Sequence, residues 1–244
     1  MDKYSDILSS FKTQKNLNPK IWESPSGNPK MNNNIRERLL EISYEFLDFL
    51  GVDIIVTDII VTGSLSNYNW SKYSDVDLHI VANYNQFPSN QVDLYKEFFN
   101  LKKIIFNDKH DITIYGYDVE LYVQDESETH FSSGVYSVLF DKWINNPKKE
   151  NVKLDLQKIK NKSKQWMDII DGVIENAQDE DIDTAKSIIK KYKDKLKKYR
   201  TCGLEKDGEY SYENLVFKVL RRNGYIEKLY NFGDEFVDVK LSIK

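Results

Sequence analysis

The chain has 244 residues, of which 40% are hydrophobic and 30% charged, so its composition excludes a disordered protein. Its formal net charge of -4 excludes a polycation, and any nucleic-acid surface would have to be a local patch. The single cysteine, Cys202, excludes an internal disulfide. No run approaches the roughly 20 apolar residues of a membrane span. Because no apolar signal segment occurs at the N-terminus, we expect a cytoplasmic location and no membrane partner.

The first part of the chain predicts an arm, a helix and a strand in that order. Residues 1–30 are rich in Asn, Lys, Ser and Pro, which predicts an irregular arm anchored by Ile21 and Trp22. Apolar residues recur at helical spacing over 33–50, ahead of a glycine, and predict a helix. The β-branched residues that follow predict a strand whose buried part is 58–62.

The next strand carries two acids on one side. In "DVDLHIV", residues 75–81, apolar residues alternate with Asp75, Asp77 and His79, so the polar side chains share the face turned away from the core. We expect His79 to be a hydrogen-bonded residue of the cleft floor rather than a metal ligand. A helix is predicted over 91–106.

A hairpin follows this helix and supplies a third acid. Gly116-Tyr117 lies between two alternating runs and indicates the turn. In the second strand, Asp118, Glu120 and Tyr122 face away from the core, which leaves two candidates for an acid beside the first pair. A further strand and turn are predicted over 132–144.

After Pro147 the sequence becomes helical. Apolar stripes at helical spacing predict helices, with Gly203 and Gly208 breaking the chain, over residues 152–176, 183–200, 211–222 and 226–236. The fold class is therefore α+β, with a small mixed or antiparallel sheet flanked by helices and an all-helical C-terminal half. We predict two domains, 1–147 with a core at 52–125, and 148–244.

Asp75 and Asp77 indicate a metal site. Residues i and i+2 of a strand project from one face about 7 Å apart, and two carboxylates there repel each other unless a cation lies between them. Paired divalent ions suit such a row and suit in-line attack on a phosphate. Because the chain has no ligand spacing typical of zinc, carboxylates would hold the metal, which favours Mg²⁺ or Mn²⁺.

Gly63-Ser64 at the end of the preceding strand predicts a phosphate-binding turn. Glycine lets the backbone turn tightly and approach a ligand, and Ser64 offers a hydroxyl and a backbone N–H. The loop that follows contains further donors for phosphate, which are Ser66, Asn67, Ser71, Lys72 and Ser74.

This arrangement resembles a known family. Gly63-Ser64, ten residues, then Asp75-x-Asp77 between two strands, with Glu120 in "VELYV", resembles the signature of the polymerase-β-like nucleotidyltransferases. The resemblance covers roughly residues 52–125. The segments "NYNWSKYSDVDLHIV" and "VELYVQD" are most similar to small uncharacterised nucleotidyltransferases encoded by tailed phages.

The resemblance implies an enzyme of the EC 2.7.7 type. Asp75 and Asp77 would bind two magnesium or manganese ions, and Glu120 would bind the catalytic ion and help deprotonate an acceptor hydroxyl. Gly63 and Ser64 would hold the triphosphate. An NMP would pass from an NTP to a hydroxyl of an RNA 3′ end, a small molecule or a protein, with release of pyrophosphate.

One departure concerns the cation that holds the phosphates. Family members that act on small molecules, and toxin–antitoxin members, often carry an arginine soon after the Gly-Ser, where this chain has Leu65, Ser66 and Asn67. The resemblance therefore leaves Lys72, or basic residues of the helical half, to supply it. Those basic residues are Lys218, Arg221 and Arg222. We nominate Lys72, Ser74, Lys218 and Arg222 as nucleotide-binding residues beside Gly63 and Ser64.

Two alternatives to a catalytic role remain at this point. The chain could be a binding module for nucleotide or RNA whose acids are vestigial, or a toxin–antitoxin protein of the same fold. A basic stretch at 183–200 could contact RNA phosphates, although a solvated helix face explains it as well.

Overall fold

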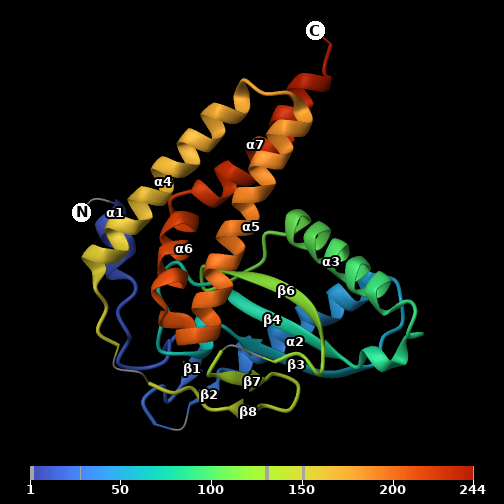
Figure 1. Ribbon diagram of the computed structural model, residues 1–244. Helices are drawn as coiled ribbons and strands as arrows, with labels where there is room; N and C mark the ends of the chain where they lie inside the picture. Colours follow the sequence, from blue (N-terminus) through green and yellow to red (C-terminus); the bar gives the residue numbers. More distant parts are fainter. Residues whose placement is uncertain (1–2, 28, 130–131, 150–151, 244) are drawn as a thin grey trace. The chain divides into compact units, whose positions relative to one another are not determined.

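The computed structural model describes residues 3–27, 29–129, 132–149 and 152–243 and is mixed α+β (Figure 1). It divides into two compact units, a sheet unit of Lys12–Asn151 and a helical unit of Met1–Phe11 with Val152–Lys244. The predicted fold class is confirmed. Whereas the sequence places the first residues with the sheet, residues 1–11 group with the helical unit.

The sheet unit is built on six strands in the order β5-β6-β4-β3-β7-β8 (Figure 1). Their bounds are β3 Val56–Thr62, β4 Val76–Ala82, β5 Thr113–Ile114, β6 Tyr117–Asp125, β7 Val135–Ser137 and β8 Lys142–Asn145. Only β4 and β6 pair in parallel, and the other neighbours are antiparallel. The hairpin over 113–125 and the further strand near 135 are confirmed.

A crossover through α3, Val92–Lys109, makes β4 and β6 parallel, since parallel neighbours need a long connection. The pairing register sets Asp77 directly opposite Glu120. A short 3₁₀ turn, η2 at Tyr84–Gln86, precedes α3.

The apolar faces of the strands pack under two helices. The predicted helix α2 spans Asn33–Leu50, with the Asn32 side chain accepting a hydrogen bond at its start and Gly51 in the left-handed conformation at its end. Phe46 of α2 lies edge-on to Phe106 of α3, with ring centroids 5.0 Å apart. The strand residues buried in this core include Ile59, Val61, Val76, Leu78, Ile80 and Leu121.

The N-terminal region is more ordered than an irregular arm. Its helix α1 spans Lys3–Ser9, and two short strands, β1 at Trp22–Glu23 and β2 at Lys30–Met31, pair with each other. The prediction missed them because a seven-residue helix or a two-residue strand is too short to leave a clear periodic pattern in the sequence. Trp22 is the predicted anchor: it is buried and stacks on Trp143 with centroids 4.5 Å apart.

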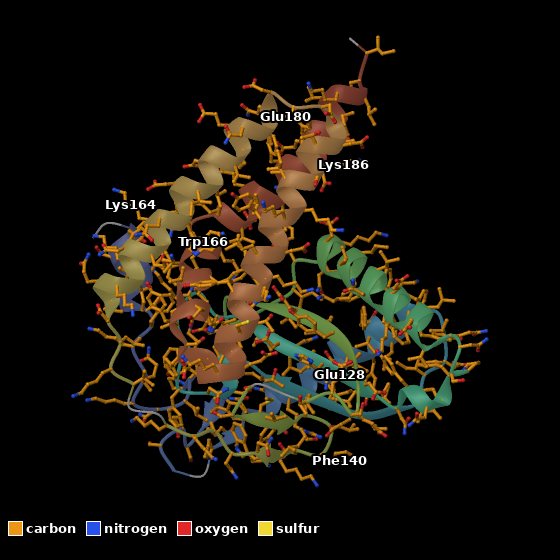
Figure 2. All side chains as sticks on the ribbon, in the orientation of Figure 1. Glu128, Phe140, Lys164, Trp166, Glu180 and Lys186 are labelled. Atoms are coloured by element: carbon orange, nitrogen blue, oxygen red, sulfur yellow. The ribbon has the colours of Figure 1, made fainter. Side chains whose placement is uncertain are left out.

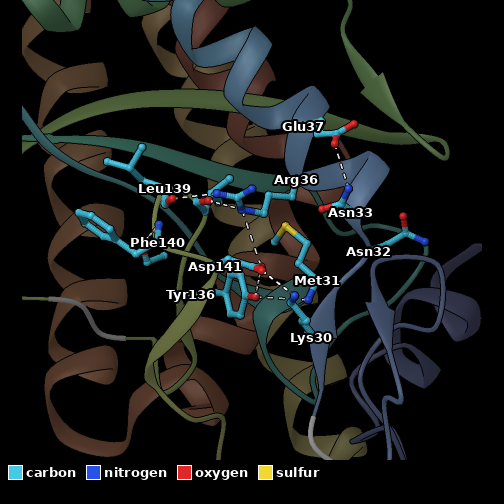
Figure 3. Close-up of polar contacts among 12 residues, drawn as sticks. Lys30, Met31, Asn32, Asn33, Arg36, Glu37, Tyr136, Leu139, Phe140 and Asp141 are labelled. Atoms are coloured by element: carbon cyan, nitrogen blue, oxygen red, sulfur yellow. Dashed lines mark hydrogen bonds and ion pairs between the residues drawn. The ribbon is translucent and has the colours of Figure 1, made fainter.

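Asp141 joins α2 to the β7–β8 hairpin (Figure 3). Its carboxylate accepts from the Tyr136 hydroxyl at 2.7 Å and pairs with the Lys30 ammonium at 2.7 Å. Burial acts to raise the pKa of Asp141, but these hydrogen bonds and the charges of Lys30 and Arg36 outweigh it and hold the pKa below its usual value. Arg36 also donates to the carbonyl of Leu139 at 2.8 Å, so the hairpin is fixed from two directions.

The helical unit contains α4 Leu156–Gln178, α5 Ile182–Asp207, α6 Tyr212–Arg222 and α7 Tyr225–Leu241, besides α1 and the 3₁₀ turn η3 Gly208–Tyr210. Ser211 caps α6 as predicted. The prediction that Gly203 breaks the chain is wrong, because Gly203 lies within α5. A Cβ there would come within 2.6 Å of the Glu213 Cβ, so this glycine allows close packing rather than a turn.

Trp166 of α4, labelled in Figure 2, lies in the interior of the helical unit and is 4% exposed. Its ring centroid is 5.7 Å from that of Tyr199 on α5. The apolar stripe of α4 is therefore core, as its spacing predicts. Among the described residues, no helix combines the length and the apolar character needed to cross a membrane.

Candidate metal centre

Three carboxylates from two strands converge on one point of the sheet unit. Asp75 directly precedes β4, Asp77 lies on β4 and Glu120 lies on β6. One oxygen of each lies within 4.8 Å of the other two, and all three side chains are partly buried. Oxygen ligands so close together suit Mg²⁺ or Mn²⁺. The donor set therefore fits the metal that the sequence predicts.

Glu120, rather than Asp118, joins the pair. Asp118 lies on the same strand but is exposed, and it sits opposite Thr113 of β5. Glu120 sits opposite Asp77 because of the β4–β6 register. Between the two acids that alternation left open, strand pairing selects Glu120 for the cluster.

Gly63 packs against the carboxylate of Asp77. Its backbone has φ 71° and ψ -160°, a conformation essentially restricted to glycine. A Cβ at this position would lie 1.7 Å from Asp77 Oδ2. The turn at the end of β3 can pass Asp77 of β4 only because residue 63 has no side chain.

The loop after Gly63 is held by its own polar side chains. Ser64 begins the 3₁₀ turn η1, Ser64–Ser66, and its hydroxyl donates to Ser74 Oγ at 2.8 Å. Ser74 Oγ also accepts from the backbone N–H of Ser71 at 2.9 Å. Ser64 and Ser74, both nominated for phosphate, are therefore brought together across the ten-residue loop.

Asn67 is the anchor of this loop. Its amide nitrogen donates to the carbonyl of Gly63 at 2.7 Å, and its amide oxygen accepts from Ser133 Oγ at 2.6 Å and from the backbone N–H of Gly134 at 2.8 Å. The side chain is 6% exposed. Asn67 thus ties the end of β3 to the segment before β7, a structural role that the sequence does not reveal.

A layer of hydrogen-bonded side chains lies beside the triad. The Tyr122 hydroxyl donates to Glu120 Oε2, and the Tyr122 ring stacks on that of His79 with centroids 4.7 Å apart. His79 Nδ1 lies 2.5 Å from Gln124 Oε1, so the two side chains share a hydrogen bond. The prediction that His79 is hydrogen-bonded is confirmed.

Burial and acidic neighbours shift the pKa values of the two residues beside Glu120. Burial, followed by the charges of Glu120 and Asp77, raises the pKa of Tyr122, so its hydroxyl keeps its proton and remains a donor. Lys103 of α3 lies with its ammonium 4.0 Å from the centroid of the Tyr122 ring. Burial lowers the pKa of Lys103, and the charges of Glu120 and Asp77 oppose that shift.

Sequence reasoning missed Lys103 and the contact made by Tyr122. The signal for Tyr122 was present, because it follows Glu120 with period two on the same face. Lys103 gives no comparable signal, since only the docking of α3 on β6 brings it to the site. Tyr122 pairs with His79 of β4, and on the other side of β6 the short strand β5 reaches only Tyr117 and Asp118.

A cavity of about 490 Å³ borders Glu120 between α3 and the start of β6. Its lining includes Lys103, Asn107, His110, Asp111, Asp118 and Glu120. This volume lies within the range of small-molecule sites.

The nominated cations lie in different units. Lys72 is in the sheet unit, with its ammonium 5.1 Å from the centroid of the Tyr73 ring. Lys218 donates to Glu209 at 2.7 Å within the helical unit. Arg222 of the same unit donates to Ser10 Oγ at 2.6 Å.

Comparison with known proteins returns no relative. No protein-family model matches the chain, and neither the curated proteins nor the solved structures include a match. Any functional conclusion must therefore come from the site itself.

Proposed function

We propose that this chain is a metal-dependent nucleotidyltransferase that moves an NMP from an NTP to a hydroxyl acceptor. The observation that carries this proposal is the convergence of Asp75, Asp77 and Glu120, with Gly63 packed against Asp77. A metal cage and a tight backbone turn at its edge are the two parts needed to hold a nucleoside triphosphate.

Each acid has a role in this reaction. Asp75 and Asp77 would hold two magnesium or manganese ions, and Glu120 would hold the ion nearer the acceptor. Bound metal would supply positive charge against the charge that develops on the phosphate oxygens. Tyr122, by donating to Glu120 Oε2, leaves the other oxygen of Glu120 available to the ion.

The strand order suggests how the substrates lie. In an in-line displacement the attacking and leaving oxygens lie on opposite sides of phosphorus. Gly63 and Ser64 directly follow β3, which lies on one side of β4. Glu120 lies on β6, which is on the other side. We therefore assign the triphosphate to the β3 side and the acceptor to the β6 side, where the 490 Å³ cavity borders Glu120.

The reaction needs no reactant besides the NTP and the acceptor. The acceptor oxygen forms a bond to the α-phosphorus as the bond from that phosphorus to the bridging oxygen breaks. Pyrophosphate leaves with its electron pair, and the hydroxyl proton passes to Glu120 or to water. A cytoplasmic location, expected from the sequence, fits an enzyme that consumes NTP.

The direct test is incubation with Mg²⁺ and each α-labelled NTP in turn, together with RNA, small-molecule and protein acceptors. Transfer of label and release of pyrophosphate are measured for the wild type, Asp77→Asn and Glu120→Gln. We expect each substitution to lower the rate by about two to four orders of magnitude, because charge stabilisation dominates phosphoryl transfer.

Asp53→Asn is the matched control, since it removes an exposed carboxylate of the sheet unit that lies outside the cluster and outside the lining of the 490 Å³ cavity. It should retain most of the activity. Equal rates for the wild type and the Asp77→Asn variant would refute the catalytic role. Magnesium-dependent NTP binding without transfer would instead support a binding module.

A further inference from the structure

Lys103 is a cation of the sheet unit that lies at the Tyr122 ring and lines the same cavity as Glu120. Its ammonium packs on the ring of Tyr122, and the Tyr122 hydroxyl is bound to Glu120. The side chain is half-buried and lies in the field of both Glu120 and Asp77. A half-buried lysine held at a ring whose hydroxyl is bonded to Glu120 of the triad calls for an explanation in terms of the charge of the triad.

The triad has an electrostatic problem before any metal arrives. Three carboxylates with oxygens within 4.8 Å of one another repel, and Glu120, with its long side chain, could escape by rotating into solvent. The hydrogen bond from Tyr122 opposes that rotation but adds no charge. A positive group nearby is what lowers the repulsion.

We infer that Lys103 is the resident counter-ion of the triad, which a divalent cation must displace when it binds Asp75, Asp77 and Glu120. This inference rests on the metal-binding part of the proposed function and not on the transfer reaction. Lys103 is thus a positioning residue that keeps the cage assembled while it is empty and sets how much divalent ion is needed to fill it.

The surroundings of Lys103 give its ammonium room to move. The side chain borders the 490 Å³ cavity together with Glu120, and it also borders a second cavity of about 190 Å³ together with Tyr122. When an ion enters the triad, like charges drive the ammonium away, and either cavity can receive it without displacing the protein core.

The consequence for metal affinity has a definite sign. In the metal-free protein Lys103 partly neutralises the triad. An entering ion therefore gains less electrostatic free energy, and the ammonium also repels it. Replacing Lys103 by a neutral residue of similar length leaves the triad more repulsive when empty and removes that opposition. Both effects tighten divalent binding, whereas a lysine with only a structural role would leave affinity unchanged or weaken it.

The test is titration of the full chain with Mn²⁺, followed by calorimetry and by the electron paramagnetic resonance of free Mn²⁺ at low ionic strength. Lys103→Met should bind Mn²⁺ about tenfold more tightly than the wild type, and Lys103→Arg, which keeps the charge, should remain within about twofold of it. Lys96→Met is the matched control, because Lys96 lies two turns earlier on α3 and borders only the smaller of the two cavities. It should also remain within about twofold of the wild type. Thermal melting establishes that each variant is folded.

The outcomes separate the two proposals. Unchanged or weaker Mn²⁺ binding by a folded Lys103→Met variant overturns the counter-ion role even if the enzyme transfers nucleotides. Tighter binding by this variant, with no transferase activity in any protein, supports the counter-ion role and removes the proposed reaction. A wild type that binds no Mn²⁺ overturns the metal site, and the counter-ion role with it.

Discussion

Gly63→Ala is the substitution whose effect follows most directly from the geometry of the site. The new methyl group would sit 1.7 Å from Asp77 Oδ2, far inside contact distance, and φ at this position is 71°. Two costs therefore add. The backbone conformation costs a non-glycine residue roughly 1–3 kcal/mol, and displacing a packed side chain costs roughly 1–3 kcal/mol more.

Gly51→Ala is the control for a positive φ without a clash. Gly51 also has a positive φ, 69°, but a Cβ there would meet no atom within 4 Å. This variant should lose only the conformational part, about 1 kcal/mol. The total for Gly63→Ala should be roughly 2–6 kcal/mol. Its excess over Gly51→Ala reports the clash with Asp77 together with the costlier backbone conformation of residue 63, whose ψ is -160° against 20° at Gly51.

The assay is urea unfolding followed by tryptophan fluorescence, together with Mn²⁺ titration of each folded variant. Because Asp77 must move to admit the methyl group, Gly63→Ala should also bind Mn²⁺ at least tenfold more weakly, while Gly51→Ala should bind as the wild type does. Equal destabilisation by the two substitutions, with equal Mn²⁺ affinity, would refute the view that Gly63 serves the position of Asp77.

Four further substitutions test the scaffold. Hydrogen bonds and cationic neighbours outweigh burial and lower the pKa of Asp141, so its contribution is present above the unfolded pKa of about 3.9 and is lost as pH falls through the folded value. Asp141→Asn should therefore destabilise by about 1 kcal/mol at pH 7 and by nothing well below pH 4 in urea melts, and a pH-independent loss would contradict this. Gly203→Ala should destabilise by about 1–3 kcal/mol despite its better helix propensity, whereas Gly172→Ala, which meets no atom within 4 Å, should stabilise by up to about 1 kcal/mol in thermal melts. Asn67→Ala strands buried partners and should cost about 2–4 kcal/mol, with faster amide hydrogen exchange at Gly134; unchanged exchange would argue against its anchoring role.

Local patterns predicted much of the secondary structure for identifiable reasons. The helix at Asn33–Leu50 is predicted with its bounds because helical spacing and a terminal glycine agree, and the structure adds an asparagine cap at the same start. Gly203 misled the prediction because a glycine in a helix and a glycine in a break look alike in sequence. What distinguishes Gly203 is the close approach of Glu213, a residue beyond the end of the helix that contains Gly203.

In the candidate site, too, local patterns predicted some features and contacts between distant segments decided others. Alternation in "DVDLHIV" placed Asp75 and Asp77 on a common face, since strand periodicity is a local property. Alternation could not choose between Asp118 and Glu120, which share a face of β6. The choice was made by the parallel register of β4 and β6, which depends on a crossover through α3.

The sequence by itself determined the α+β class, the helical C-terminal half, and the acids and glycine of the site. These depend on periodicity and on residue types that act within a few positions of one another. Only the tertiary structure decided that Glu120 completes the cluster, that Gly63 must lack a side chain because Asp77 lies against it, and that Lys103 packs on the Tyr122 ring. Those facts depend on which segments pair and pack across long distances in the chain, and no local pattern encodes that.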